Sequence, residues 1–488
     1  MADFAGQWKV SSTERTVAPP VLAVDLDGTL LKTNLLLESL LALLHQKPQY
    51  VFLLPLWLLR GKAYLKQQIA RRVSLDASAL PYRTEFLHYL ERERAEGRSL
   101  VLATANDEQI ARQVSDYLKL FDMVLASDGT TNLSGKSKRD RLLAEFGEKG
   151  FDYAGDHRRD VVVWASARKA IVVGSNTHVR SSAARVAQVE RVFEGRRKGP
   201  FEYLEALRPR HWLKNLLVFV PLCAAHRVHE IDLWAKALLV FLAFGCFASS
   251  GYLLNDLLDL EADRHHPHKR SRPFAAGDLP LSYALAMIPA LFGLGCILGG
   301  LLSPLCLGIL LIYSALTVTY SLSVKKIVLL DVILLAGLYT IRIMAGSAAV
   351  GIWPSYWLLA FSMFLFLSLA LVKRYGELVI MRSLEGKQAK VRGYQMTDGE
   401  LLATMGTASG YLAVLVLALY ITSGTAQVLY GRHQLMWFLC PLLLYWISRI
   451  WLIAHRGRMH DDPLVFATKD PTSRIMILLM LAIAVLAV

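Results

Sequence analysis

Residues 251–279 read GYLLNDLLDLEADRHHPHKRSRPFAAGDL, an apolar run that changes abruptly into acids and then into bases. Asp256, Asp259 and Asp263 are spaced i, i+3 and i+7, which places them on one face if the stretch is helical. Three carboxylates on one face repel one another unless a cation lies between them, and oxygen-only ligands suit Mg²⁺. Asn255 directly precedes these acids. Three bases follow, donors of the kind that diphosphate oxygens accept: Lys269, Arg270 and Arg272. The stretch therefore predicts a site where Mg²⁺ and a diphosphate meet.

The apolar run before this stretch is one of many. The chain has 488 residues, 54% of them hydrophobic, and its mean hydropathy is +0.37. Residues 1–200 are charged and mixed, whereas long apolar runs alternate with short polar loops from about Leu213 onward. A spanning helix needs roughly 20 mostly apolar residues. We therefore predict an all-α membrane bundle of nine spans, at about 213–226, 234–254, 282–302, 304–323, 328–348, 355–372, 404–424, 434–454 and 471–488.

The basic residues of the loops predict the orientation of this bundle. With the N-terminus inside, the inner loops contain 16 Lys and Arg residues, and the outer loops contain only Arg227 and Arg432. Such an asymmetry is typical of multi-pass proteins whose basic loops stay in the cytoplasm. The N-terminal residues MADFAGQWKV lack the basic-then-apolar order of a signal peptide. We therefore expect a multi-pass protein of the inner (cytoplasmic) membrane with a cytoplasmic N-terminal domain.

Net charge and cysteines argue against other classes. The formal net charge is +14, but the bases lie mostly between apolar runs, so a bilayer and anionic substrates explain them better than nucleic acid does. The five cysteines fall in or beside apolar segments, and none is paired at metal-ligand spacing. We therefore expect no zinc site, no disulfide and no nucleic-acid partner.

The stretch NDLLDLEADRHHPHKRSRP (residues 255–273) resembles the first aspartate-rich motif of the UbiA-type intramembrane prenyltransferases. The resemblance covers about residues 205–488. It implies an all-α bundle of nine spans, with an active site that opens toward the cytoplasm under helical caps. It also implies that Asp256, Asp259 and Asp263 bind Mg²⁺, with Asn255 beside them at the substrate.

A second region separates the branches of that superfamily. Members that act on aromatic acceptors usually carry paired aspartates there, whereas this chain has YSLSVKKIVLLDVILLAGLYTIRIMAG (residues 320–346), with a single Asp331. Together with LRPRHWLKN, LALVKRYGEL and HRGRMHDDPLVFATKD, this is similar to the branch that transfers phosphoribose to decaprenyl phosphate. Arg342 lies mid-span, where a lone Arg is costly, which favours a polar cavity. The similarity implies these substrate contacts: Lys214, Asn255, Lys269, Arg270, Arg272, Tyr320, Lys325, Asp331, Arg342, Lys373 and Arg374.

The resemblance implies a Mg²⁺-dependent transferase with phosphoribosyl diphosphate as donor and a polyprenyl phosphate as acceptor. Many cations suit a donor with two phosphate groups and an acceptor that is itself a phosphate. The metal and the cations would stabilise the departing diphosphate, and an anionic acceptor needs no strong general base. The alternative is a prenyltransferase that moves a prenyl group from prenyl diphosphate to an aromatic or other acceptor. A transporter is a more distant alternative because the acids cluster in one inner loop, and homo-oligomerisation stays open.

A second group of motifs lies near the N-terminus. VLAVDLDGTL (residues 21–30) is an apolar strand that ends in Asp25-Leu26-Asp27, and it resembles the first motif of the haloacid-dehalogenase (HAD) superfamily. An aspartate can attack a phosphoryl group while a second one, two residues on, serves as acid or base. LVLATAND, NLSGKSKRD and DYAGDHRRD follow in the order of that superfamily. The resemblance implies the catalytic residues Asp25, Asp27, Thr104 and Lys138, and the Mg²⁺ ligands Asp25, Asp27, Asp156 and Asp160.

The chain is therefore expected to divide into a tail (1–19), an α/β Rossmann-like HAD phosphatase domain (20–185), a linker (186–205) and the membrane domain (206–488). A helical cap is expected at about 34–95. Its segment LLLESLLALLHQKPQYVFLLPLWLLRG has no uninterrupted apolar run of roughly 18 residues, so we expect a buried or membrane-apposed cap rather than a hairpin through the bilayer.

The fusion of the two domains suggests a shared substrate. Phosphoribosyl transfer leaves a 5-phosphate on the lipid, and a fused phosphatase that removes it would give a polyprenyl-phosphoryl ribose. The alternative is a regulatory N-terminal domain that only binds or senses a phosphorylated ligand.

Overall fold

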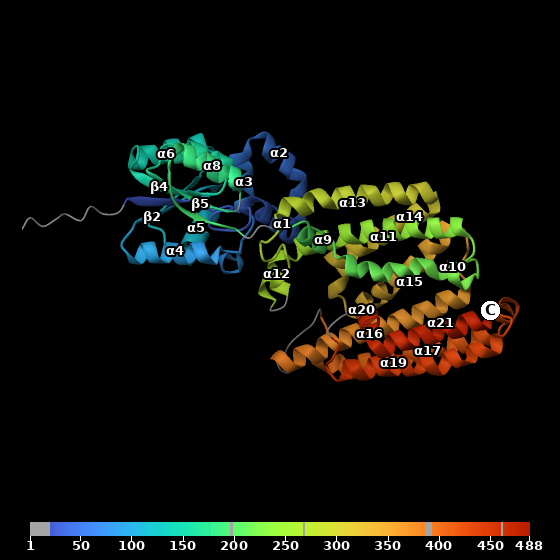
Figure 1. Cartoon of the computed structure of the whole chain (residues 1–488). Coiled ribbons are helices and arrows are strands. Elements are labelled where there is room, and N and C mark those ends of the chain that lie inside the picture. Colours follow the sequence, from blue (N-terminus) through green and yellow to red (C-terminus); the bar gives the residue numbers. More distant parts are fainter. Residues whose placement is uncertain (1–19, 175, 196–198, 267–268, 386–392, 460–461) are drawn as a thin grey trace, which may run out of the picture. The chain divides into compact units, whose positions relative to one another are not determined.

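The computed structural model describes the chain except residues 1–19, 175, 196–198, 267–268, 386–392 and 460–461 (Figure 1). The tail, Asp461 and the basic residues Lys387, Lys390 and Arg392 of one expected inner loop thus lie outside the described residues. The chain forms two compact units. The first combines Met1–Glu202 with Asp256–Tyr283, and the second combines Tyr203–Asn255 with Ala284–Val488. The aspartate-rich stretch, expected within the membrane domain at 206–488, therefore packs with the N-terminal part of the chain.

The first unit is built on a six-stranded sheet of order β3-β2-β1-β4-β5-β6, and all its strand pairs are parallel. Helices must cover both faces of such a sheet, and alternate residues of β1 enter two separate cores: Leu22 and Val24 one, Ala23 the other. The predicted parallel sheet is confirmed. Its strands are β1 (Val21–Val24), β2 (Leu100–Asp107), β3 (Met123–Ser127), β4 (Phe151–Gly155), β5 (Lys169–Val173) and β6 (Gln188–Phe193). The sixth strand lies where the linker was expected.

Helices surround this sheet, and Figure 1 shows its strands between α4 and the pair α6 and α8. Phe86 and Leu90 of α4 belong to the same core as Leu22, so the end of the expected cap is part of the sheet layer. The helices here are α1 (Leu35–Gln46), α2 (Leu54–Leu59), α3 (Lys62–Ala70), α4 (Thr84–Ala95), α5 (Glu108–Leu118), α6 (Lys136–Phe146), α7 (Val161–Trp164) and α8 (Thr177–Val186). The two apolar helical segments of the cap, Leu35–Gln46 and Pro48–Leu59, are too short to be candidate spans.

The remainder of the chain is helical. Seven helices of the described residues are long and apolar enough to cross a membrane, or eight if α20 and α21, bent by 89° at their junction, form one span. The helices are α9 (Pro200–Ala206), α10 (Val220–Ala224), α11 (Ile231–Leu258), α12 (Leu260–His265), α13 (Leu281–Leu302), α14 (Pro304–Leu322), α15 (Leu330–Val350), α16 (Tyr356–Glu385), α17 (Gly399–Thr422), α18 (Gly424–Leu429), α19 (Leu439–His455), α20 (Pro463–Lys469) and α21 (Pro471–Ala487).

The prediction of nine spans is wrong at both ends of the bundle. The first candidate, 213–226, forms part of a 3-10 helix (Pro209–Phe219) and the five-residue helix α10. Pro221 lacks a backbone N–H, which interrupts a continuous helical ladder there. The last candidate, 471–488, is one arm of the bent pair.

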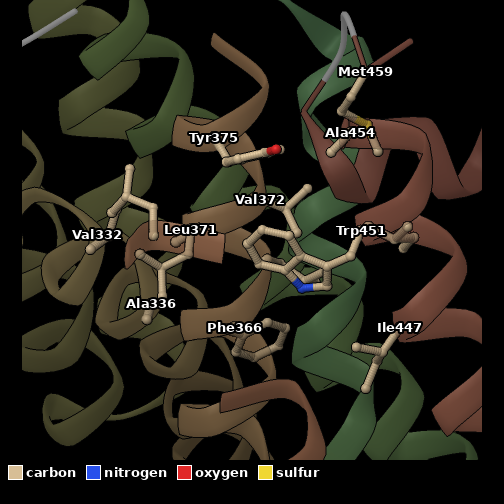
Figure 2. Close-up of a cluster of buried hydrophobic side chains, with 14 of the residues drawn as sticks. Val332, Ala336, Phe366, Leu371, Val372, Tyr375, Ile447, Trp451, Ala454 and Met459 are labelled. Carbon is tan, nitrogen blue, oxygen red and sulfur yellow. The ribbon is translucent and has the colours of Figure 1, made fainter. Parts of the chain in front are cut away.

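Helix α16 is longer than the span expected at 355–372. It continues to Glu385, so Lys373 and Arg374 lie on a helix and not in a loop. Figure 2 shows the core where α16 packs with α15 and α19, with the Trp451 ring among its side chains. The Trp451 indole donates to Ser368 Oγ at 3.1 Å. A Cβ at Gly406 would lie only 2.0 Å from the Trp451 ring, so the approach of α17 depends on glycine at this position.

Candidate functional site

The aspartate-rich stretch does not form one helix. Asp256 lies in the last turn of α11, which ends at Leu258, and Asp263 lies in the short helix α12. Asp259, between them, is the N-cap of α12 and has φ −95° and ψ 12°. The expectation of three acids along one continuous helix face is therefore wrong, because the helix is interrupted at Asp259.

Arg272 joins two of these acids. Its Nη1 lies 3.2 Å from Asp256 Oδ1 and 2.5 Å from Asp263 Oδ2. Both carboxylates are buried. The two carboxylates thus place hard oxygen donors near one another, beside the guanidinium that they share. Their hard oxygen donors therefore fit Mg²⁺.

The other predicted residues of this stretch lie before Asp256 or after Asp263 in the sequence. Asn255 is half-buried on α11, one residue before Asp256. Lys269 and Arg270 lie in a 3-10 helix, Lys269–Ser271, which leads into Arg272. Arg272 itself contacts the acids, so its first role in this structure is to pair with them.

The second unit contains a separate polar group around Asp462. Asp462 Oδ2 lies 2.7 Å from Lys214 Nζ and 3.3 Å from Lys373 Nζ, and the Tyr339 hydroxyl donates to the same oxygen at 3.1 Å. Burial raises the pKa of Asp462, but the two ammonium groups outweigh it and leave the pKa below its ordinary value. Two cations thus share one carboxylate.

Arg342 adds a third cation beside this group. Its Nε donates to Asn215 Oδ1 at 3.1 Å, its Nη2 to the Tyr313 hydroxyl at 2.9 Å and its Nη1 to the Leu338 carbonyl. Its guanidinium also lies over the Tyr339 ring. Each of these partners is neutral, so the charge of Arg342 stays uncompensated by them. The buried Asn215 Nδ2 has no hydrogen-bond partner among the described residues.

We call this group the basic cluster: Lys214, Asn215, Tyr339, Arg342, Lys373 and Asp462. Two of its three cations contact the Asp462 carboxylate, and the third, Arg342, bonds to neutral groups. An excess of positive charge that is partly buried, beside a buried amide donor, favours a bound anion. The mid-span Arg342 thus lies in a polar cluster, as its position in the sequence indicated.

Arg374 behaves differently from the substrate contact that we expected. It is fully buried, and its Nε donates to Asp331 Oδ2 at 2.5 Å, its Nη1 to Glu377 at 2.7 Å and its Nη2 to the Tyr320 hydroxyl at 2.6 Å. The Tyr394 hydroxyl donates to the other oxygen of Asp331 at 2.5 Å. All three nitrogens of the guanidinium are used, so this network joins α14, α15 and α16 and argues against direct substrate contact by Tyr320, Asp331 or Arg374. Lys325 lies half-buried in the turn Val324–Lys326.

The first unit contains the second candidate site, at the carboxyl edge of the sheet. Asp25 follows β1 and Asp156 follows β4, the neighbouring strand. Asp25, Asp156 and Asp160 place carboxylate oxygens within 4.8 Å of one another, and Lys138 Nζ lies 2.9 Å from Asp25 Oδ1. Burial, and then the charges of Asp25 and Asp160, raise the pKa of Asp156 to about 8. Crowded oxygen donors of this kind fit Mg²⁺.

The turn after β1 is specific. Gly28 has φ +74°, and a Cβ there would lie 2.1 Å from the Asp156 carboxylate, so this approach requires glycine. Asp27, expected among the metal ligands, is not part of the group of three. Its Oδ1 accepts from the Leu35 N–H at 3.0 Å and from Asn106 Nδ2 at 2.9 Å. Burial raises the pKa of Asp27 to about 6, which suits an acid or base near neutral pH.

Thr104 and two residues that the sequence analysis did not single out, Asn106 and Lys66, support this arrangement. Thr104 Oγ1 accepts from the Asn106 backbone N–H at 3.1 Å and so orients Asn106 toward Asp27. Lys66, on α3, donates to the Ala105 carbonyl at 2.5 Å and to Asn132 at 2.9 Å, and burial lowers its pKa. Asn106 belongs to the motif LVLATAND, so the sequence could have indicated it. Lys66 belongs to no such motif, so the sequence could not indicate its role.

These features define a multi-pass helical membrane protein with a buried acidic, metal-type site and a separate, partly buried basic cluster. Residues 216–484 match the UbiA prenyltransferase family. The chain belongs to the UbiA prenyltransferase family, and it is a multi-pass membrane protein.

Three relatives extend this comparison. The chain is 36% identical to the uncharacterized protein y4nM of Sinorhizobium fredii, over 93% of this chain and 88% of that protein. It is 38% identical to the nodulation protein NoeC of Azorhizobium caulinodans, over 58% of this chain and 92% of that protein. It is 31% identical to the decaprenyl-phosphate phosphoribosyltransferase of Mycolicibacterium smegmatis, over 56% of this chain and 88% of that protein.

Proposed function

We propose that this chain transfers 5-phosphoribose from phosphoribosyl diphosphate to a polyprenyl phosphate, such as decaprenyl phosphate, and releases diphosphate. The observation that carries the proposal is the basic cluster: among the described residues Lys214 and Lys373 contact the Asp462 carboxylate, and Arg342 bonds to neutral groups. A prenyl diphosphate has one anionic group, whereas this reaction also requires sites for a 5-phosphate and a lipid phosphate. The similarity to a decaprenyl-phosphate phosphoribosyltransferase supports the same reaction.

In the proposed reaction, an oxygen of the lipid phosphate attacks C1 of the ribose, and the bond from C1 to the diphosphate breaks. The diphosphate leaves with the electron pair of that bond. Asp256 and Asp263 would hold Mg²⁺, which supplies charge neutralisation for the diphosphate when bound. The cations of the basic cluster bind phosphate oxygens and orient them. The acceptor oxygen is already anionic at neutral pH, so no side chain needs to remove a proton from it.

The Asp256→Ala variant tests this assignment in the full chain, reconstituted with phosphoribosyl diphosphate and decaprenyl phosphate. Mass spectrometry of the lipid measures the rate of product formation. We expect this rate to fall at least about 100-fold, because one ligand of the charge-neutralising metal is lost. Glu261→Ala is the matched control, since Glu261 is an exposed acid of α12 in the same stretch. Full activity of the Asp256→Ala variant would contradict the assignment.

The alternative within the family is transfer of a prenyl group from prenyl diphosphate. The two reactions differ in the donor. The same reconstituted protein is therefore supplied with phosphoribosyl diphosphate or with prenyl diphosphate, and the masses of the products are determined by mass spectrometry. A prenylated aromatic product without a phosphoribosylated lipid would favour the alternative.

We further propose that the first unit is a Mg²⁺-dependent phosphatase that removes the 5-phosphate from the lipid product. The group Asp25, Asp156 and Asp160 with Lys138 supports this proposal. Asp25 attacks the phosphoryl group, the bond from phosphorus to the ribose oxygen breaks, and Asp27 protonates that oxygen. Water then hydrolyses the aspartyl phosphate.

The Asp25→Asn variant should still make the lipid but accumulate its 5-phosphorylated form, seen as an added phosphate by mass spectrometry. Asp128→Asn, at an exposed acid of the same unit, is the control. No accumulation in the Asp25→Asn variant would leave the first unit with a binding or regulatory role.

We propose a location in the cytoplasmic membrane with this unit inside, which the basic loops support.

A further inference from the structure

The cap of the first unit has an apolar outer side. Phe52 is 83% exposed and Leu59 is 85% exposed, and three further side chains between them are exposed as well: Leu53, Leu56 and Leu58. They belong to the 3-10 helix Pro48–Leu53 and to α2. Trp57, by contrast, is buried in the cluster that supports the cap. We call the five exposed residues the apolar cap face.

The charges around the apolar cap face have one sign. From Ser39 to Leu75 the sequence contains no Asp or Glu, but it contains six bases: Lys47, Arg60, Lys62, Lys66, Arg71 and Arg72. Lys47, Arg60 and Lys62 flank the face directly and are exposed. Exposed aromatic and leucine side chains bordered by bases match an anionic lipid surface, whose acyl boundary takes the apolar groups and whose headgroups take the bases.

We propose that the apolar cap face inserts into the headgroup boundary of an anionic bilayer. The cap helices are too short to cross the membrane, so this contact is interfacial. A bilayer is always available because seven helices of the same chain are long and apolar enough to span one. The contact keeps five large apolar side chains out of water and confines the phosphatase-like unit to the surface where a lipid substrate arrives.

Photocrosslinking of the full chain tests this contact in nanodiscs of equimolar phosphatidylcholine and phosphatidylglycerol. The photoreactive residue p-benzoylphenylalanine replaces Phe52 or Leu59, and in a matched control it replaces Tyr117, which is 50% exposed on α5 of the same unit. We expect lipid adducts at positions 52 and 59, enriched in phosphatidylglycerol, and none at 117. With Arg60→Gln and Lys62→Gln combined, the enrichment should fall several-fold, since two bases that attract anionic headgroups are then lost.

Two outcomes would overturn the proposal. Adducts at position 52 to another protein, or to a second copy of the chain, would show that a protein covers the face. Equal adduct yields at positions 52 and 117 would show that the face has no preference for lipid.

A second, independent observation concerns the link between the cap and the aspartate-rich stretch. Arg264, next to Asp263, donates its Nη1 and Nη2 to the two carboxylate oxygens of Glu38 on α1, at 2.8 and 2.6 Å. Both side chains are buried. Arg264 Nε also donates to the Ala275 carbonyl, at 3.0 Å. A bidentate, buried ion pair fixes both distance and orientation, and it lies within the first compact unit.

The same helix α1 touches the other candidate site. Its first residue, Leu35, donates its N–H to Asp27, and Glu38 follows one turn later. From Arg264 the contacts lead through the adjacent Asp263 to Arg272 and Asp256. Helix α1 therefore lies between the candidate phosphatase acid and the acidic transferase site.

We infer that Glu38 and Arg264 are positioning residues that hold the carboxylates of Asp263 and Asp256 in the positions that the transfer reaction requires. This inference rests on the proposed role of those two acids. Removal of one partner would leave a buried charge unpaired and would allow the stretch to shift. A displacement of about 1 Å at a reacting site can lower the rate about 100-fold.

The Glu38→Gln variant of the full chain tests this role. We expect a tenfold to hundredfold loss of transfer, a higher Mg²⁺ concentration for half-maximal rate, and faster hydrogen exchange in peptides from 256–283. The exchanged pair, Glu38→Arg with Arg264→Glu, should recover part of the rate. Glu93→Gln is the matched control because Glu93 also loses an ion pair, with Arg98 at 2.6 Å, elsewhere in the unit.

The Asp256→Ala variant separates failure of this inference from failure of the proposed function. If Asp256→Ala abolishes transfer but Glu38→Gln leaves the rate and the Mg²⁺ dependence unchanged, the positioning role is wrong. If Asp256→Ala retains full transfer, the proposed role of Asp256 in that reaction is wrong, and if the unmodified chain makes no phosphoribosylated lipid, the proposed function is wrong. A loss of rate in Glu38→Gln that equals the loss in Glu93→Gln, with no change in Mg²⁺ dependence, would reduce the pair to a general stabilising contact.

Discussion

Individual carboxylates in this protein differ in how their charge is compensated. Asp331 is paired with Arg374, and Asp152 is paired with Arg98 and Arg168. Asp256 and Asp263, in contrast, share one arginine. Burying a charge without a partner is costly, so a buried pair such as Asp331 and Arg374 stabilises the fold. We interpret acids that have an arginine of their own as supports of the fold, and the two that share Arg272 as the candidate site.

This distinction predicts a stability effect at Arg374. The Arg374→Met variant leaves Asp331 buried without its partner, which costs about 3–5 kcal/mol. We expect a lower midpoint of thermal unfolding for the purified protein in detergent. The double variant Asp331→Leu with Arg374→Met should recover most of the loss, because an apolar pair of similar volume carries no unpaired charge. An unchanged midpoint in Arg374→Met would contradict the network described for this residue.

The resemblance of the N-terminal motifs to the HAD superfamily indicated Asp25, Asp156 and Asp160, and the structure brings the carboxylates of these three residues together. Sequence reasoning could not distinguish Arg374 from Lys373, two adjacent bases in one motif. Their roles differ because Arg374 is enclosed by α14, α15 and α16 while Lys373 reaches Asp462. Such a difference depends on distances between elements that are far apart in sequence.

At the scale of elements, hydropathy predicted which segments are apolar but not where helices begin and end. Residues 213–226 are apolar enough for a span, yet they contain Pro221 and divide into two short pieces. Helix α16, by contrast, continues through Lys373, Arg374 and Glu377. These charges are tolerated because they pair with Asp462, Asp331 and one another. Composition alone does not reveal that compensation.

The packing of α17 on α19 predicts a second stability effect. In Gly406→Ala the added Cβ would lie 2.0 Å from the Trp451 ring, and such overpacking typically costs about 1–3 kcal/mol. Gly337→Ala is the control, since Gly337 is a helical glycine with nothing within 4 Å of a Cβ. We expect thermal unfolding in detergent at a lower temperature for Gly406→Ala only. Equal midpoints for the two variants would contradict the close approach at Trp451.

At the scale of the whole molecule, the two compact units do not follow the order of the chain. The family match begins at residue 216, yet the first unit includes Asp256–Tyr283 together with residues up to Glu202. The membrane part thus contains a segment whose packing partners lie in the N-terminal part. Sequence motifs placed the boundary near residue 205. A motif shows which family a segment resembles, but it does not show which part of the chain that segment packs against.

This division predicts the effect of a truncation. A chain that begins at residue 203 keeps the family match but loses the partners of the aspartate-rich stretch, among them Glu38. We expect it to transfer phosphoribose at least about tenfold more slowly than the full chain when both are reconstituted in nanodiscs. Residues 1–202 supplied as a separate polypeptide should restore part of the rate. A truncated chain with the full rate would show that the stretch keeps its arrangement alone.

The discontinuous first unit has a consequence for biosynthesis. Residues 1–202 leave the ribosome before the segment Asp256–Tyr283 has been made, and residues 203–255 must be synthesised in between. At roughly 5–20 residues per second this interval lasts several seconds. During that time Glu38 has no Arg264 to pair with, although all six strands of the sheet have already been synthesised. Most of the long apolar helix α11 precedes Asp256 in the chain. The N-terminal unit can therefore be completed only after the first long membrane helix has been synthesised, and not when residue 202 has been translated.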